Sequence, residues 1–237
     1  MALNDVKALT FDVFGTAVDY RSTIIDEGEQ INQQKGWQID WEQVVDAWRG
    51  RYRPFMARVA SGELPWTKLD DLHRMALEEV LEEFSIPALS EQEKIQLNLV
   101  WHRLRPWHDS VEGLTRLRTR FTLATLSNGN VSLLADMAKY SKLPWDCIFS
   151  AELAHAYKPD PRTYQMAIEL LSLHPHEVMM VAAHQSDLRA AQAEGMRAAF
   201  VTRPLEFGRA RIPDLSADAS FDVVATDLID LADKLGV

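Results

Sequence analysis

The sequence predicts an α/β fold in which a parallel sheet carries an inserted helical domain. Short apolar runs alternate with helical patterns about a dozen residues long, which is typical of a parallel sheet covered by helices on both faces. Residues 20–103 break this alternation, because they carry one helical signal after another and no convincing strand. A chain of 237 residues is long enough for one large domain or for a core with a smaller insert.

The predicted strands are short and almost entirely apolar. The first covers residues 6–11, and Asp12 follows it directly. Such runs indicate parallel strands that are buried on both faces. Runs of the same kind predict four further strands, over residues 121–126, 178–183, 198–201 and 221–225. The core domain is therefore expected to comprise residues 1–19 and 104–237.

Helix signals divide the insert, residues 20–103, into several helices. Asp40 and Gln43 form a capping-box pattern that starts one helix, and Pro54 is expected to kink or end it. The next predicted helix has one apolar face, made of Leu69, Leu72, Met75, Val80, Leu81 and Phe84.

A third helix is predicted after a second capping box, formed by Ser90 and Glu93. Its Ile95, Leu99 and His102 recur near helical spacing. An insert that begins directly after the first strand lies above the carboxyl ends of the core strands. Open α/β sheets bind their ligands at these ends.

Composition excludes several classes of protein. Hydrophobic residues make up 47% and charged residues 25% of the chain, which is the ordinary globular balance. The net charge of −10 disfavours a general surface for nucleic acid or anionic membranes, so neither partner is expected. The absence of a long apolar run and of a signal-peptide pattern predicts a cytoplasmic location. Cys147 is the single cysteine, which excludes an internal disulfide.

Asp12 is the first candidate for chemistry, because it follows a buried strand directly. Gly15 in the next loop allows the backbone to approach a ligand closely. A carboxylate in such a place can be a nucleophile. Alone, an aspartate at a strand end more often caps a turn.

Two further loci carry polar groups at strand ends or helix starts. Ser127 and Asn128 supply a hydroxyl, an amide and backbone N–H groups, although Ser-Asn-Gly alone is more often a plain turn. Lys158 precedes a helix that starts with proline and carries Tyr164. The lysine is placed to pair with Asp12 and hold it ionised, whereas an isolated lysine is usually exposed.

His184 and Asp187 form the fourth locus, at the head of a helix that follows a strand. Alone, Asp187 indicates a helix N-cap and His184 a structural histidine. Four polar loci in a repeated β-α series nevertheless predict a shared active site, since the strand ends of a parallel sheet meet at one edge.

These motifs resemble those of a known family. Residues 11–16, 126–129 and 157–164 and the segment around Asp187 are similar to the four motifs of the haloacid dehalogenase (HAD) superfamily. Their spacing and the position of the insert resemble its L-2-haloacid dehalogenase branch, also called (S)-2-haloacid dehalogenase type II. The resemblance covers essentially the whole chain. It implies a Rossmann-like core, a helical cap at residues 20–103 and a homodimer.

Two positions separate this branch from the superfamily's phosphatases. Those enzymes have a second aspartate at the position of Phe14 and a Mg²⁺-binding aspartate at the position of Ala183. The resemblance therefore implies no metal ion and no other cofactor. An apolar Phe14 suits a substrate whose reacting carbon is hydrophobic.

The resemblance also implies a reaction. Asp12 attacks C2 of a small 2-haloalkanoate, expels halide with inversion and forms an ester, which water then hydrolyses, so that (S)-2-haloacids give (R)-2-hydroxyacids. Arg49 resembles the arginine that receives the halide, with Asn128 as its partner, although Arg51 and Arg53 lie close by in the sequence. The preferred halogen and the acid chain length stay open.

The remaining roles follow from the same resemblance. Ser127 and loop amides are expected to hold the substrate carboxylate. Thr16, Lys158, Tyr164 and Asp187 are expected to orient the nucleophile and the hydrolytic water. His184 stands where the better-known pattern has asparagine, so that it either helps as a general base or shapes the pocket. Two rivals are a phosphatase acting on a small metabolite and a catalytically silent binding protein.

Overall fold

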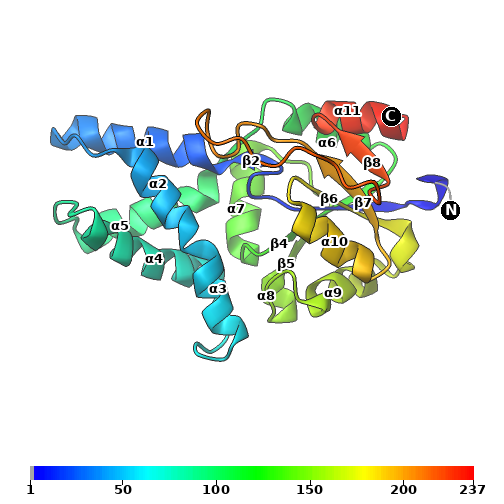
Figure 1. Ribbon diagram of the computed structural model, residues 1–237, viewed down its shortest axis with the longest axis horizontal. Coiled ribbons are helices and arrows are strands. Elements are labelled where there is room, and N and C mark those ends of the chain that lie inside the picture. The colour runs from blue at the N-terminus through cyan, green and yellow to red at the C-terminus, as the bar shows by residue number, and fades with distance from the viewer. Residues whose placement is uncertain (1–2) are drawn as a thin grey trace.

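The computed structural model describes residues 3–237 and contains a six-stranded sheet in which every neighbouring pair is parallel (Figure 1). This confirms the predicted α/β class. From one edge to the other, the strands are β5 (Cys147–Ser150), β4 (Thr122–Ser127), β1 (Ala8–Phe11), β6 (Val178–Ala182), β7 (Arg197–Val201) and β8 (Val223–Ala225). The order places β1 between β4 and β6, so the three strand ends with predicted site residues are neighbours.

Helices cover both faces of the sheet. Leu9 and Phe11 of β1 belong to one apolar cluster, which includes residues of α6 (Ser110–Leu117), α7 (Val131–Ser141) and α11 (Leu228–Leu235). Ala124 and Leu126 of β4 belong to another, with α9 (Pro161–Leu171) and α10 (Gln185–Ala193). Burial on both faces explains why the strands are almost continuously apolar.

The edge strand β5 is absent from the expectations drawn from the sequence. Its apolar run is only Cys147, Ile148 and Phe149, and the first two are half-buried. An edge strand has a neighbour on one side only, so a short and partly exposed run suffices. The chain then passes through the single turn of α8 (Ala151–Ala154) into the segment that carries Lys158.

Residues 20–103 form a helical segment that lies to the left of the sheet in Figure 1. It contains α1 (Tyr20–Lys35), α2 (Trp41–Gly50), α3 (Tyr52–Ala60), α4 (Leu69–Glu83), α5 (Glu91–Asn98) and the 3₁₀ helix η2 (Leu99–Arg103). The two-residue strands β2 (Val18–Asp19) and β3 (Arg105–Pro106) pair where the chain leaves the sheet region and returns to it. The division into two domains stays a prediction.

The helix predicted to start after Asp40 begins there but ends earlier than expected. Asp40 caps α2 by accepting a hydrogen bond from the backbone N–H of Gln43 at 3.2 Å. The expectation for Pro54 is wrong, because α2 ends at Gly50 and Pro54 lies in the first turn of α3. Proline is tolerated there, since the first N–H groups of a helix have no partner within it.

The second capping box is confirmed, but the side-chain spacing predicted for the helix that it starts is not. Ser90 and Glu93 exchange both hydrogen bonds of the box at the start of α5. Ile95 is 39% exposed, whereas Leu97 and Trp101 are buried. The α-helix changes to a 3₁₀ helix after residue 98, and this alters the spacing of side chains on its buried face. Among residues 3–237, no helix has the length and apolar character needed to cross a membrane.

Candidate active site

Asp12 lies at the carboxyl end of the central strand β1. Its backbone N–H donates to the carbonyl of Val181 on β6 at 3.0 Å, which continues the ladder by one residue. The loop then turns at Gly15, whose φ of 82° is in the left-handed region. A Cβ on Gly15 would lie 2.3 Å from Oε1 of Glu206. Both the backbone conformation and the lack of space therefore require glycine here.

Asp12 is only 7% exposed, and its carboxylate accepts three hydrogen bonds from side chains. Oδ1 lies 3.0 Å from Nζ of Lys158. Oδ2 lies 2.9 Å from Oγ1 of Thr16 and 2.9 Å from Nδ1 of His184. Burial raises the pKa of Asp12, but the charges and hydrogen bonds of Lys158 and His184 outweigh burial and hold this pKa far below its usual range. Asp12 is therefore ionised.

Lys158 joins Asp12 to Asp187. Its Nζ is 2.5 Å from Oδ2 of Asp187, and the hydroxyl of Tyr164 on α9 donates to Oδ1 at 2.5 Å. Burial lowers the pKa of Lys158, yet the two carboxylates raise it above its usual value. The pKa of Asp187 is raised by burial and by the charge of Asp12, against the opposing effect of Lys158. The two acids thus differ in basicity although they share one ammonium group.

His184 lies between two carboxylates, those of Asp12 and Glu206. Its Nε2 is 2.8 Å from Oε1 of Glu206, which is 2% exposed. Burial lowers the pKa of His184, but hydrogen bonds to Asp12 and Glu206 raise it to about 10. Both ring nitrogens therefore carry a proton at neutral pH. No motif in the sequence marks Glu206, which is a lone glutamate in the loop after β7.

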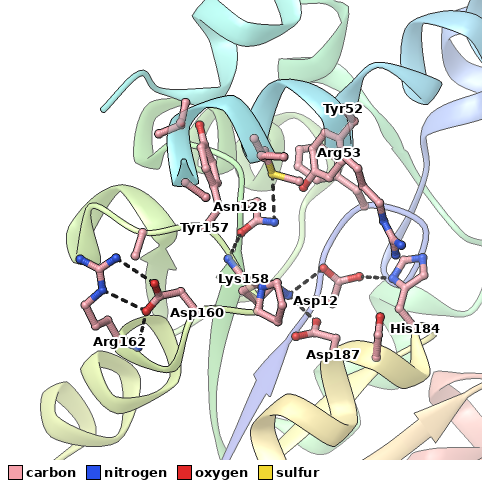
Figure 2. A pocket seen from close by; sticks show the side chains of 18 of the residues that line it. Asp12, Tyr52, Arg53, Asn128, Tyr157, Lys158, Asp160, Arg162, His184 and Asp187 are labelled. Carbon is pink, nitrogen blue, oxygen red and sulfur yellow. Dashed lines mark hydrogen bonds and ion pairs between the residues drawn. The ribbon is translucent and has the colours of Figure 1, made fainter. Parts of the chain in front are cut away.

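These side chains line a cavity of about 670 Å³ between the sheet and the helical segment. Figure 2 shows Asp12, Lys158, Asp187 and His184 gathered on its core side, with Tyr52 and Arg53 of α3 across from them. Eight of the predicted site residues line it, namely Asp12, Phe14, Arg49, Asn128, Lys158, Tyr164, His184 and Asp187. Tyr52 and Met56 also line it, although no motif in the sequence marks them.

Thr16 and Ser127 are not among the lining residues, and the structure places them behind the cavity wall. Thr16 contacts the site through Asp12, as described above. The hydroxyl of Ser127 is fully buried and accepts a hydrogen bond from the backbone N–H of Gly129 at 3.2 Å. Asn128 faces the cavity, and its Oδ1 accepts from the backbone N–H of Lys158 at 2.7 Å.

The three neighbouring arginines have different surroundings. The guanidinium of Arg49 lies 4.0 Å from the ring centroid of Tyr52 and 4.8 Å from that of Tyr20, and its buried Nη1 has no hydrogen-bond partner. Arg51 instead pairs with Glu79 and Glu83 of α4. Arg53 is exposed at the cavity rim. Arg49 is thus the arginine that has a buried, unused donor beside the cavity.

Within the part of the chain that the structure describes, no group of three or more His, Cys, Asp or Glu side chains is arranged to hold a metal ion. Nζ of Lys158 occupies the space between Asp12 and Asp187. Ala183 has no ligating side chain, and its backbone N–H donates to Oγ1 of Thr16 at 2.9 Å.

The fold and this site define a class of hydrolase. Residues 6–195 match the family of haloacid dehalogenase-like hydrolases, and the chain belongs to that family. Two similar solved structures belong to one branch of this family, the L-2-haloacid dehalogenases. The L-2-haloacid dehalogenase PA0810 is 44% identical with a TM-score of 0.94, over 97% of this chain and 98% of that one. The defluorinating L-2-haloacid dehalogenase Rha0230 is 42% identical with a TM-score of 0.94, over 98% and 96%.

A curated relative leads to the same branch. The (S)-2-haloacid dehalogenase 1 of Pseudomonas sp. (strain CBS-3) is 28% identical over 85% of this chain and 86% of its own length. The resemblance to the L-2-haloacid dehalogenases, first drawn from four short motifs, is confirmed.

Proposed function

We propose that this protein hydrolyses (S)-2-haloacids to (R)-2-hydroxyacids and halide, with Asp12 as the nucleophile and without a metal ion. One observation carries the proposal. An ionised carboxylate and a buried guanidinium with an unused N–H line the same cavity. Displacement of halide at carbon needs a nucleophile on one side and a cation for the leaving anion on the other.

In the first step, a carboxylate oxygen of Asp12 attacks C2 in line and forms a C–O bond. The carbon–halogen bond breaks, and the halide leaves with its electron pair toward Arg49 and Asn128. The rings of Phe14 and Tyr52 on the cavity wall limit access of water to the departing anion. Attack from the side opposite to the halogen inverts the configuration at C2.

In the second step, water attacks the carbonyl carbon of the resulting ester. Asp187 has a raised pKa and is the proposed acceptor of a proton from this water. Tyr164 donates to Asp187 and fixes its orientation. The backbone amides of the loop after β4 are the proposed site for the substrate carboxylate, and Ser127 shapes this loop through Gly129.

The helical segment is proposed to act as a cap domain, residues 20–103, over a core domain of residues 1–19 and 104–237. Its helices α2 and α3 contribute Arg49 and Tyr52 to a cavity whose other wall comes from the sheet. A homodimer is proposed from the family resemblance. A cytoplasmic location is proposed as well. No nucleic-acid or membrane partner is proposed.

A single turnover in ¹⁸O-water with excess enzyme tests the covalent step. Asp12 transfers its own oxygen to the product, so unlabelled 2-hydroxyacid and a labelled Asp12 peptide are expected by mass spectrometry. Labelled product with unlabelled Asp12 would show direct attack by water instead.

Parallel assays address the substrate class and the metal. Chloroacetate, fluoroacetate, racemic 2-chloropropionate and a phosphate ester are incubated with and without EDTA, and released halide and phosphate are measured. Halide release that EDTA leaves unchanged is expected. Phosphate release that depends on Mg²⁺ would support the phosphatase alternative, and no release from any substrate would support a silent binding protein.

A further inference from the structure

We propose that Oδ1 of Asp12 is the attacking oxygen, and that Thr16 and a protonated His184 held by Glu206 form an oxyanion hole around Oδ2 during ester hydrolysis. This inference rests on the proposed aspartyl-ester mechanism. It assigns Glu206 a positioning role and makes His184 a hydrogen-bond donor, in contrast to the general-base role considered from the sequence.

The two oxygens of Asp12 have unequal surroundings. Oδ2 faces two donors, Thr16 and His184, each at 2.9 Å. Oδ1 faces only Nζ of Lys158, at 3.0 Å. Each hydrogen bond occupies a lone pair and lowers the reactivity of the oxygen that accepts it. Oδ1 therefore retains the more available lone pair and attacks the substrate carbon.

This choice decides where negative charge develops in the second step. After alkylation, Oδ1 bridges Cγ to C2 and Oδ2 is the carbonyl oxygen of the ester. When water adds to Cγ, the carbonyl electron pair moves to Oδ2. Donors about 2.7–3.1 Å from a developing oxyanion stabilise it most effectively, and both existing donors to Oδ2 lie within that range.

Collapse of the intermediate uses the remaining groups. The Cγ–Oδ1 bond breaks, and Oδ1 leaves as the hydroxyl oxygen of the product with a proton from Lys158. The proton lost by water passes to Asp187, whose Oδ2 contacts Nζ of Lys158 directly. Return of that proton to Lys158 restores the ammonium group. Asp12 then carries the second proton of the water as a carboxylic acid and releases it to solvent, which restores the ionised carboxylate. The oxygen of water stays on Asp12, so all atoms and charges balance.

Thr16 is oriented for this role by its other hydrogen bond. Its Oγ1 accepts from the backbone N–H of Ala183 at 2.9 Å, and this directs the hydroxyl proton toward Oδ2 of Asp12. Thr16 is fully buried, so water does not compete for the hydroxyl.

Glu206 keeps His184 in its donor form. Its carboxylate is 2% exposed and accepts from Nε2 of His184, and an unpaired buried carboxylate would be costly. The carboxylates of Asp12 and Glu206 face the two ring nitrogens of His184. The nearby cations are Lys158, which contacts Asp12, and Arg49, which interacts with the charges of Asp12 and Glu206. When alkylation removes the charge of Asp12, Glu206 is the remaining carboxylate that keeps the imidazole protonated.

Glu206→Gln tests the proposal, because glutamine keeps the shape of the side chain and removes its charge. Pre-steady-state halide release measures alkylation, and intact-protein mass spectrometry measures decay of the ester. Alkylation is expected to change by less than about threefold, whereas ester decay slows by ~100-fold at about pH 8.5. Ester decay recovers toward the wild-type rate at about pH 6, where His184 without Glu206 regains its proton.

Two further variants sharpen the test. Glu194→Gln is the control, since it removes a carboxylate that does not line the cavity, and it is expected to leave both steps unchanged. His184→Asn replaces the imidazole by an uncharged donor. This variant is used to test the proposal if Glu206→Gln does not fold. It is expected to slow ester decay equally at about pH 6 and pH 8.5, without recovery.

The outcomes separate this inference from the proposed function. Ester decay at the wild-type rate in Glu206→Gln, or a slow rate that low pH does not restore, would overturn the oxyanion hole. Ester decay that becomes faster in Glu206→Gln as the pH rises would show that His184 acts as a base. If wild-type protein releases halide in a single turnover while no ester forms on Asp12, the covalent mechanism itself fails.

Discussion

Nζ of Lys158 lies 3.0 Å from Oδ1 of Asp12, although the two residues are 146 positions apart in the chain. The ammonium group stabilises the ionised form of the carboxylate in a site that is largely closed to water. The same ammonium group also contacts Asp187, which lies in the helix after β6. The nucleophile therefore depends on groups brought together from three separate segments of the chain.

Asp12→Asn is expected to abolish turnover while the fold is retained. The amide has the same shape but is a poor nucleophile, so kcat should fall on the order of 10⁴-fold. Halide release measures the activity, and circular dichroism with thermal unfolding checks the fold. Halide release near the wild-type rate would show that Asp12 is not the nucleophile.

Arg49→Lys is expected to lower kcat by about tenfold or more. Lysine keeps the charge but loses the planar set of donors, and the contact strengthens as charge develops on the halogen. Arg51→Lys is the matched control, because Arg51 pairs with Glu79 and Glu83 and does not line the cavity. If kcat falls in the Arg51 variant and not in the Arg49 variant, Arg49 is not the arginine that binds the halide.

His102→Gln is expected to lower stability most strongly in mildly acidic solution. His102 of η2 contacts Asp70 of α4 at 3.1 Å and Asp136 of α7 at 2.8 Å, and so joins the helical segment to the core. Burial lowers the pKa of His102, but hydrogen bonds to both aspartates outweigh burial and raise it above its usual value. A raised folded-state pKa stabilises the protein fully below the unfolded pKa of about 6.5.

This contribution is lost as the pH rises through the folded-state pKa of His102. Thermal unfolding of wild-type and variant protein should therefore differ more at about pH 5.5 than at about pH 9. Burial raises the pKa of Asp70, but its contacts with His102 and Asn130 outweigh burial and lower it, so the titration of Asp70 does not produce the trend. A difference between the two proteins that is the same at both pH values would show that His102 acts through packing alone.

The sequence by itself determined the sheet and most of the site, because these depend on local and repeated patterns. Continuous apolar runs predict strands buried on both faces, and parallel strands bring their carboxyl ends to one edge. Asp12, Asn128 and His184 each follow such a strand within two residues. Their convergence around one cavity therefore follows from the chain direction of the strands.

Only the tertiary structure decided which arginine has a free donor and which state His184 adopts. Arg49 and Arg51 are two residues apart, and the distinction arises because α4 supplies two glutamates to Arg51 and none to Arg49. His184 is protonated because Asp12 and Glu206, 172 and 22 positions away, face its two nitrogens. A pKa is set by burial and by charges within a few ångströms, and these distances exist only after distant segments have packed together.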